Sequence, residues 1–247
     1  MDRSLYIAMS GAKQTLLEQN SNANNLANMQ TTGFKSDLEW FRNRPVYGSG
    51  YPTRVYAMIE KPGTDFSSGA MQTTGRDLDV AINGEGLIAV QDEEGKEAYT
   101  RAGDLRITPE GFLRTGTGLQ IVGQNGPITI PPSEKLTIGT DGTISSIPMG
   151  AGNATTMVVL DRIKLVKPDM KAVEKLGDGL LHTKDGTQLV ASTYVSLAQG
   201  ILESSNVNAF VAMTEMIELA KNFELQTKVM KNVDENASTS AKLMQIA

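Results

Sequence analysis

Both ends of this 247-residue chain carry apolar and small side chains at alternating intervals of three and four residues. This spacing is typical of a helix that packs along one seam, as in a coiled coil. The N-terminal set comprises Leu5, Met9, Ala12, Leu16, Gln19, Ala23 and Leu26. The C-terminal set comprises Met213, Met216, Ala220, Phe223, Thr227, Met230, Asp234, Ala237, Ala241 and Met244. A second apolar row with Ile217, Val229 and Val233 widens the face of the C-terminal helix.

An antiparallel pair of these helices could simply close one domain. Two helices share only one seam, however, so such a pair would leave the outer apolar rows of the C-terminal helix in water. We therefore expect the terminal helices to pack against other subunits. The C-terminal helix has several N-cap candidates just before it begins, namely Ser204, Ser205, Asn206 and Asn208.

The middle of the chain, roughly residues 75 to 200, shows short apolar runs separated by Gly and Pro. The expected strands are Leu78–Ile82, Gly86–Val90, Glu97–Arg101, Phe112–Thr115, Leu119–Val122, Ile128–Ile130 and Thr156–Val166. Turn signals lie between them at residues 125–127, 141–142 and 185–186. This pattern predicts an all-β domain, either a sandwich or a Greek-key-like barrel.

The fold class is therefore α+β, with an all-β domain inserted between two coiled-coil-like terminal helices. We expect residues 1–30 and 203–247 to form the helical domain and residues 75–202 to form the β domain. The segment 31–74, which is rich in Pro and Gly, is expected to be a linker or an extended excursion.

Five asparagines, Asn20, Asn22, Asn24, Asn25 and Asn28, fall inside the N-terminal helical pattern. Asn is a poor helix former because its side chain competes with the backbone for hydrogen bonds. A fraying helix end would explain the last of them, but not the first four. We interpret the cluster as uncharged polar groups that specify neighbouring helices, much as a buried Asn sets the register of a coiled coil. A seam with so many polar residues should be weak alone, so we expect the terminal segments to be largely disordered in the free chain.

Composition excludes several classes of function. The chain has 23 basic and 28 acidic residues, a net charge of −5, without blocks of one sign, which argues against nucleic-acid binding. It has no cysteine, so disulfides, thiolate metal sites and thiol nucleophiles are excluded. We find no run of about 18 apolar residues for a membrane span, and the N-terminus lacks the features of a cleaved secretory signal.

An enzyme is the main alternative class. The single histidine, His182, lies beside expected strand residues. A lone histidine there is more often a surface or core residue whose hydrogen bonds are satisfied by the fold than a catalytic base. The acidic run Asp92, Glu93 and Glu94 precedes Gly95 and reads as a solvated hairpin tip. We therefore expect no enzymatic activity and no cofactor or metal site, with a glycan-binding or glycan-cleaving β domain kept as a weaker alternative.

Three stretches together carry a family resemblance that spans essentially the whole chain. Residues 10–35, which include Asn24-Asn25-Leu26-Ala27-Asn28 and Thr31-Thr32-Gly33-Phe34-Lys35, resemble the N-terminal signature of bacterial flagellar basal-body rod and hook proteins. Residues 74–103, which end in Tyr99-Thr100-Arg101-Ala102-Gly103, are similar to the start of that family's β domain. Residues 203–208, from Glu203 to Asn208, are similar to its C-terminal helix entry.

The stretches at 127–131, 141–145 and 213–217 are similar to the proximal rod members of the family, with the distal rod subunit as the alternative. The resemblance implies a structural subunit whose terminal helices pack with other proximal and distal rod subunits, and possibly with its own copies, into a torque-carrying shaft. It also implies export by the flagellar type III apparatus without a cleaved signal peptide, and a place in the basal-body rod that crosses the periplasm.

The residues that we expect at the assembly interface combine the helix seams with the N-terminal signature. They are Leu5, Met9, Ala12, Leu16, Ala23, Asn24, Asn25, Leu26, Asn28, Gly33, Phe34, Met213, Met216, Ile217, Ala220, Phe223, Met230 and Val233.

Overall fold

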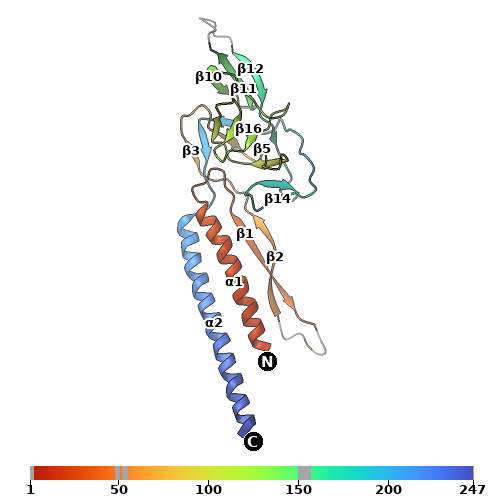
Figure 1. Cartoon of the computed structure of the whole chain (residues 1–247), viewed down its shortest axis with the longest axis vertical. Coiled ribbons are helices and arrows are strands. Elements are labelled where there is room, and N and C mark those ends of the chain that lie inside the picture. Colours follow the sequence, from red (N-terminus) through yellow and green to blue (C-terminus); the bar gives the residue numbers. More distant parts are fainter. Residues whose placement is uncertain (1–2, 48–50, 52–54, 150–156, 247) are drawn as a thin grey trace. The chain divides into compact units, whose positions relative to one another are not determined.

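The structure is a computed structural model that describes residues 3–47, 51, 55–149 and 157–246 (Figure 1). The chain divides into two compact units. The helical unit comprises Met1–Met29, Ser36–Asp65 and Val207–Ala247, and the β unit comprises Gln30–Lys35 and Phe66–Asn206. An N-terminal helix, a mostly β middle and a C-terminal helix confirm the α+β class.

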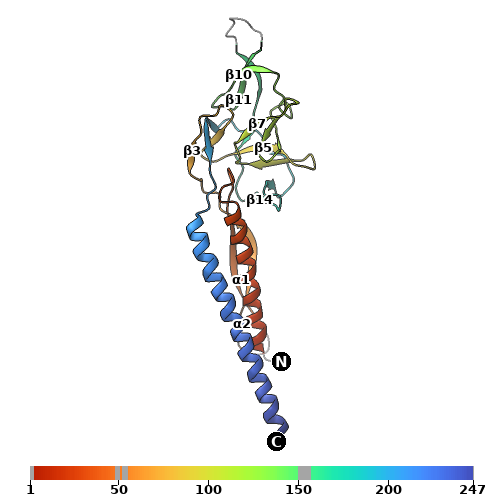
Figure 2. The same cartoon turned by 60° about the vertical axis from the view of Figure 1, so that its left-hand side comes forward.

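The helical unit is built on α1 (Arg3–Ala27) and α2 (Ala209–Ile246), which lie side by side. The pair is antiparallel, because Asn22 near the end of α1 contacts Ala212 near the start of α2, while Thr15 contacts Gln226. Since α2 is 13 residues longer (38 against 25), it continues past the start of α1 (Figure 2). Of the candidate N-caps, Asn208 caps α2, with its Oδ1 accepting hydrogen bonds from two backbone amides of the first turn.

A β-hairpin completes the helical unit, where the sequence suggested only a linker or an excursion. Strands β1 (Asp37–Pro45) and β2 (Val55–Thr64) pair antiparallel, from Asp37 opposite Thr64 to Pro45 opposite Val55. Both strands pack against α1 (Figure 1). The prolines that argued against strands are tolerated here because each strand of a two-stranded ribbon has a free edge that needs no ladder hydrogen bonds.

The β unit contains fifteen described strands. They are β3 (Met71–Thr73), β4 (Val80–Asn83), β5 (Leu87–Gln91), β6 (Glu97–Thr100), β7 (Leu105–Ile107), β8 (Leu113–Thr115), β9 (Gln120–Ile121), β10 (Ser133–Ile138), β11 (Thr143–Pro148), β12 (Val158–Arg162), β13 (Leu165–Val166), β14 (Val173–Lys175), β15 (Leu181–Thr183), β16 (Ser196–Gln199) and β17 (Ile201–Glu203). The largest sheet has the order β14-β15-β6-β5-β9-β8-β7, with β13 also paired to β5. Smaller sheets are β10-β11-β12, β16-β4 and β17-β3.

Strand β5 lies at the centre of the unit and is buried on both faces. Ile88 and Val90 belong to the larger core cluster, whereas Leu87 and Ala89 belong to a second cluster with Tyr99. Successive side chains of a strand point to opposite faces, so a strand with a core on each side reads as a continuous apolar run. The expected strand Gly86–Val90 was such a run, and β5 begins one residue later.

Two strand predictions need correction. Residues 128–130 form no strand, and only an isolated bridge joins Thr129 to Phe112. The expected strand 156–166 is divided into β12 and β13, and Thr156 itself lies outside the described residues. The expected turn at 141–142 is confirmed between β10 and β11, where Gly142 has a φ of 85°.

Candidate assembly site

The seam between α1 and α2 is displaced by one residue from the one that the apolar spacing predicted. In α1 the packed positions follow Leu5, Ala8, Ala12, Thr15, Gln19, Asn22 and Leu26. In α2 they follow Ala209, Ala212, Met216, Leu219, Phe223, Gln226, Met230 and Val233. The interval of three and four is retained, but three of the seven expected members in α1 and four of the ten in α2 are replaced by a direct sequence neighbour.

The residues that enter the seam of α1 are small or polar. Ala12, Thr15 and Asn22 are the buried ones, and the side chains of Thr15 and Gln226 exchange hydrogen bonds of 3.4 and 3.2 Å across the seam. A Cβ on Gly11 would lie 3.3 Å from the Gln226 amide nitrogen, so the helices also approach closely there. The hairpin packs on the same helix, so α1 is covered by two elements.

Several large apolar residues that were expected in the seam or on its flank lie outside it. Met9 is 53% exposed and Leu16 is 43% exposed, while Met213 and Ile217 on α2 are 47% and 58% exposed. The expected interface residues Ala23, Asn24 and Ala220 are exposed as well. These residues were expected to form the seam or its flank, and the structure places them on its outer side. We call Met9, Leu16, Ala23, Met213, Ile217 and Ala220 the outer row.

Two members of the asparagine cluster bond to neighbouring elements of the same chain, one of them a helix and the other a strand. The Asn22 amide, which is buried, donates a 2.8 Å hydrogen bond to the Ala212 carbonyl of α2. The Asn25 side chain donates to the Asp37 carbonyl at 2.9 Å and accepts from the Asp37 amide at 2.8 Å, as a paired strand would. Asn28 closes the end of α1 through a bond to the Asn24 carbonyl. Within the chain, Asn22 and Asn25 therefore specify the partners of α1.

Carboxylates on three elements of the helical unit repel one another. Burial raises the pKa of Glu18 on α1, and the charges of Glu215 on α2 and Glu39 on β1 raise it further. Burial likewise raises the pKa of Glu39, with a further contribution from Asp37. The isolated unit thus carries some electrostatic strain at neutral pH.

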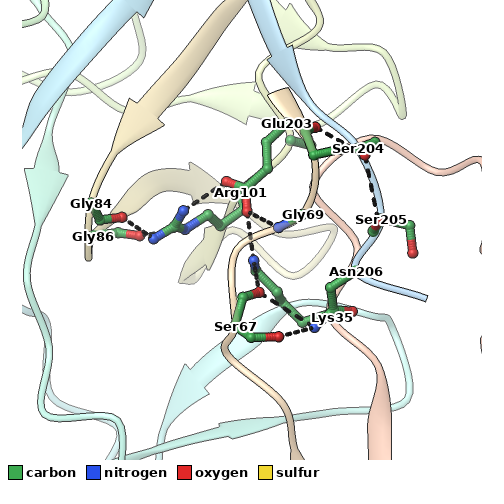
Figure 3. A network of polar contacts seen from close by, with 12 residues as sticks. Lys35, Ser67, Gly69, Gly84, Gly86, Arg101, Glu203, Ser204, Ser205 and Asn206 are labelled. Carbon is green, nitrogen blue, oxygen red and sulfur yellow. Dashed lines mark hydrogen bonds and ion pairs between the residues drawn. The ribbon is translucent and has the colours of Figure 1, made fainter. Parts of the chain in front are cut away.

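In the β unit, a buried ion-pair network joins one residue from each of the three signature stretches (Figure 3). The Glu203 carboxylate is fully buried; it meets Lys35 Nζ at 2.6 Å through Oε1 and Arg101 Nη1 at 2.6 Å through Oε2. The Gly69 amide donates a further 3.0 Å bond to Oε1. Burial alone would raise the pKa of Glu203, but the bonds from Lys35 and Arg101 outweigh it and leave the pKa below its usual value.

Two expected interface residues, Gly33 and Phe34, belong to this network's surroundings. The Gly33 amide donates to the Glu203 carbonyl at 2.8 Å, and a Cβ at Gly33 would lie 2.3 Å from the Arg101 carbonyl carbon. The Lys175 ammonium lies 3.8 Å from the centre of the Phe34 ring. Both residues therefore make contacts inside the β unit. Lys35, Arg101 and Glu203 were placed in the family motifs without an assigned role, because these stretches contain other charged residues and no signal singles out these three.

The residues considered for enzymatic chemistry take part in contacts that hold local structure. His182 Nε2 lies 2.9 Å from a carboxylate oxygen of Asp178 at the surface. Residues 92–95 form the tip of the β5–β6 hairpin, as expected, with the Gly95 amide bonded to the Asp92 carbonyl. The carbonyls of the Gly-x-Gly fragment at 84–86 accept hydrogen bonds from Arg101. In the described part of the chain, no helix has the length and apolar character that a membrane crossing requires.

A chain with exposed apolar rows on its terminal helices and a β unit stabilised by internal ion pairs belongs to the class of structural assembly subunits. Three family descriptions match it: flagella basal body rod protein over residues 5–35, the D1 domain of flagellar hook protein FlgE/F/G over 81–146, and the C-terminal part of flagellar basal body rod FlgEFG protein over 198–243.

Individual relatives agree with these matches. The flagellar basal-body rod protein FlgF of Escherichia coli is 40% identical over 253 positions and covers 100% of both chains. FlgF of Caulobacter vibrioides is 35% identical over 95% of both chains. The rod protein FlgG of Bacillus subtilis is 30% identical over 95% of this chain and 96% of its own. This chain belongs to the flagellar basal-body rod protein family, and it is more similar to these FlgF members than to that FlgG.

Proposed function

We infer that this chain is a structural subunit of the proximal part of the flagellar basal-body rod. The observation that carries the inference from the structure is the outer row, because apolar side chains that the internal seam excludes need cover from other molecules. The alternatives, a distal rod subunit or a glycan-active β domain, are not favoured, since the FlgF proteins of Escherichia coli and Caulobacter vibrioides match nearly the full length at 40% and 35% identity, against 30% for FlgG of Bacillus subtilis.

In this proposal the outer row packs against the terminal helices of neighbouring rod subunits in a coiled-coil-like arrangement. Leu5, Ala12, Leu26, Met216, Phe223, Met230 and Val233 keep their place in the internal seam. Contacts of this kind are heterologous, since one face of each subunit meets a different face of the next, and such contacts generate open helical assemblies. The shaft would transmit torque by close packing, without a reactive group. Export through the flagellar type III apparatus would bring the chain to its place of assembly.

Quantitative mass spectrometry of purified hook–basal bodies tests the function. The chain should be present in a fixed ratio to the other rod proteins, and its absence from intact basal bodies would refute the assignment. The ratio also distinguishes the proximal from the distal rod.

Matched substitutions test the outer row. Met9→Glu and Ile217→Glu should abolish incorporation into basal bodies and swimming, because they place a charge in an apolar contact. Met9→Leu and Ile217→Leu retain the apolar surface and should incorporate normally. Normal incorporation of both Glu variants would show that these residues do not face another subunit.

A further inference from the structure

The chain passes between its two units four times, after residues 29, 35, 65 and 206. The β-unit residues next to these crossings are segment 30–35, the stretch that begins at Phe66, and the stretch that ends at Asn206. Any force exchanged between helices and sheets through the covalent chain has to pass through these segments.

Side chains tie these segments to one another inside the β unit (Figure 3). Lys35 Nζ binds both the Glu203 carboxylate at 2.6 Å and the Ser67 carbonyl at 2.7 Å. The Asn206 side-chain amide donates to the Ser67 hydroxyl at 3.3 Å, and the Asn206 backbone amide donates to the Phe34 carbonyl at 3.4 Å. One lysine and one asparagine thus connect all of the crossing segments.

The other side of Glu203 is anchored in the main sheet. Arg101, which directly follows β6, binds the second carboxylate oxygen of Glu203. Its Nε also donates a 3.0 Å hydrogen bond to the carbonyl of Gly86, the residue directly before β5. Arg101 also donates to the Gly84 carbonyl. Strand β5 contributes to both core clusters, so the network ends at the most buried strand of the unit.

Buried charges are an expensive way to gain stability, because well-packed apolar side chains of similar volume often do as well or better. What charge-assisted hydrogen bonds add is direction, since each one holds two groups at a defined distance and angle. Here the directional bonds occur where the chain crosses between units, and each of the three ions has a partner of opposite charge.

We propose that Lys35, Glu203 and Arg101 form a junction clamp, which transfers force from the crossing segments through side chains into the β sheet. The inference rests on the proposed function, because force has a meaning only for a subunit of the rod. These three are positioning residues, and their charges serve the geometry of the junction more than the stability of the fold.

Lys35→Met and Lys164→Met form a matched pair for the test. Lys35→Met removes the bonds of the Lys35 ammonium to Glu203 and Ser67, and it leaves the Glu203–Arg101 pair in place. Lys164 forms a comparable, largely buried ion pair with Glu97, at 2.7 Å, in the same unit, but it touches none of the crossing segments. Hydrogen exchange is measured on the purified full chain, basal-body content by mass spectrometry, and swimming in dilute and viscous media.

Lys35→Met should accelerate exchange at residues 31–36, 66–70 and 203–207 by about tenfold or more, as the loss of a bond to a charged group predicts. The variant should still enter basal bodies and swim in dilute medium, but fail at high viscosity. Lys164→Met should leave exchange at these segments and swimming at high viscosity unchanged.

Equal exchange in the two variants, or normal swimming of Lys35→Met at high viscosity, would overturn the proposal. If Lys35→Met does not fold, the wild-type chain still decides the point. Its residues 33–35 and 203–206 should then be protected as strongly as β5, and exchange as fast as at the tip 92–96 would refute the clamp. Absence of the wild-type chain from basal bodies would instead refute the proposed function, while leaving the exchange result to be judged separately.

Discussion

Replacing Gly33 by alanine should destabilise the β unit far more than the same change at Gly75. Both glycines have a left-handed backbone, with φ values of 69° and 72°. An alanine in this region costs about 1–2 kcal/mol at either position. At Gly75 a Cβ would meet nothing within 4 Å, whereas at Gly33 it would lie 2.3 Å and 2.4 Å from the Arg101 carbonyl carbon and oxygen.

The atoms that obstruct a side chain at Gly33 are backbone atoms, so they cannot turn away as a flexible side chain could. Separating them adds an overpacking cost of about 1–3 kcal/mol. The hydrogen bond from the Gly33 amide to the Glu203 carbonyl would be strained at the same time. We therefore expect a total loss of about 2–5 kcal/mol for Gly33→Ala against about 1–2 kcal/mol for Gly75→Ala.

Differential scanning calorimetry of the full chain measures the difference. At roughly 2–4 °C per kcal/mol for a domain of this size, Gly33→Ala should lower the Tm of the β unit by about 4–20 °C and Gly75→Ala by about 2–8 °C. Equal shifts in the two variants would refute the reasoning, because they would show that segment 30–35 does not lie against the backbone at Arg101.

Three further predictions concern pH, the asparagine cluster and the terminal helices. The pKa of Glu203 in the folded chain lies below its unfolded value, so its stabilising effect is complete above about pH 4.5 and is lost as the pH falls through the folded value. The raised pKa values of Glu18 and Glu39 have the opposite effect on stability, so the helical unit should gain stability as the pH falls through these values. Hydrogen exchange measured by segment between pH 3 and 7 should separate the two responses, and parallel changes in both units would contradict them. Asn25→Ala removes two hydrogen bonds to β1 and should destabilise the hairpin by about 1–3 kcal/mol. Asn24→Ala, at an exposed position, should change little, and equal exchange of the β1 amides in the two variants would argue against the pairing of Asn25 with β1. Exchange in the free subunit should be faster along α1 and α2 than along β5, since the seam buries few large side chains, and protection of residues 5–26 equal to that of β5 would refute a helical unit that is fully stabilised only upon assembly.

Local patterns were sufficient to predict the helices and the best-buried strands. Strand β5 was recognised from its continuous apolar run, and the start of α2 from its N-cap candidates, among which Asn208 caps the helix. Strands β14 to β17 have only three or four residues each, which is too short for a periodic signal. The hairpin β1–β2 was missed because prolines and charged residues obscure its alternation, and because its packing surface is α1, which lies elsewhere in the sequence.

The fold class, the periodicity of the terminal helices and the family could all be predicted from the amino-acid order, because each depends on local spacing or on contiguous motifs. Which face of each helix is packed depends on contacts between distant segments, so it could be read only from the folded chain. Spacings of three and four continue equally well through Met9 and Leu16 as through Ala8 and Thr15, and only in the folded chain is it seen that the second set packs. The network of Lys35, Arg101 and Glu203 was likewise beyond sequence reasoning. Its members are separated by 66 and 102 positions, and only folding brings their charges within 2.6 Å.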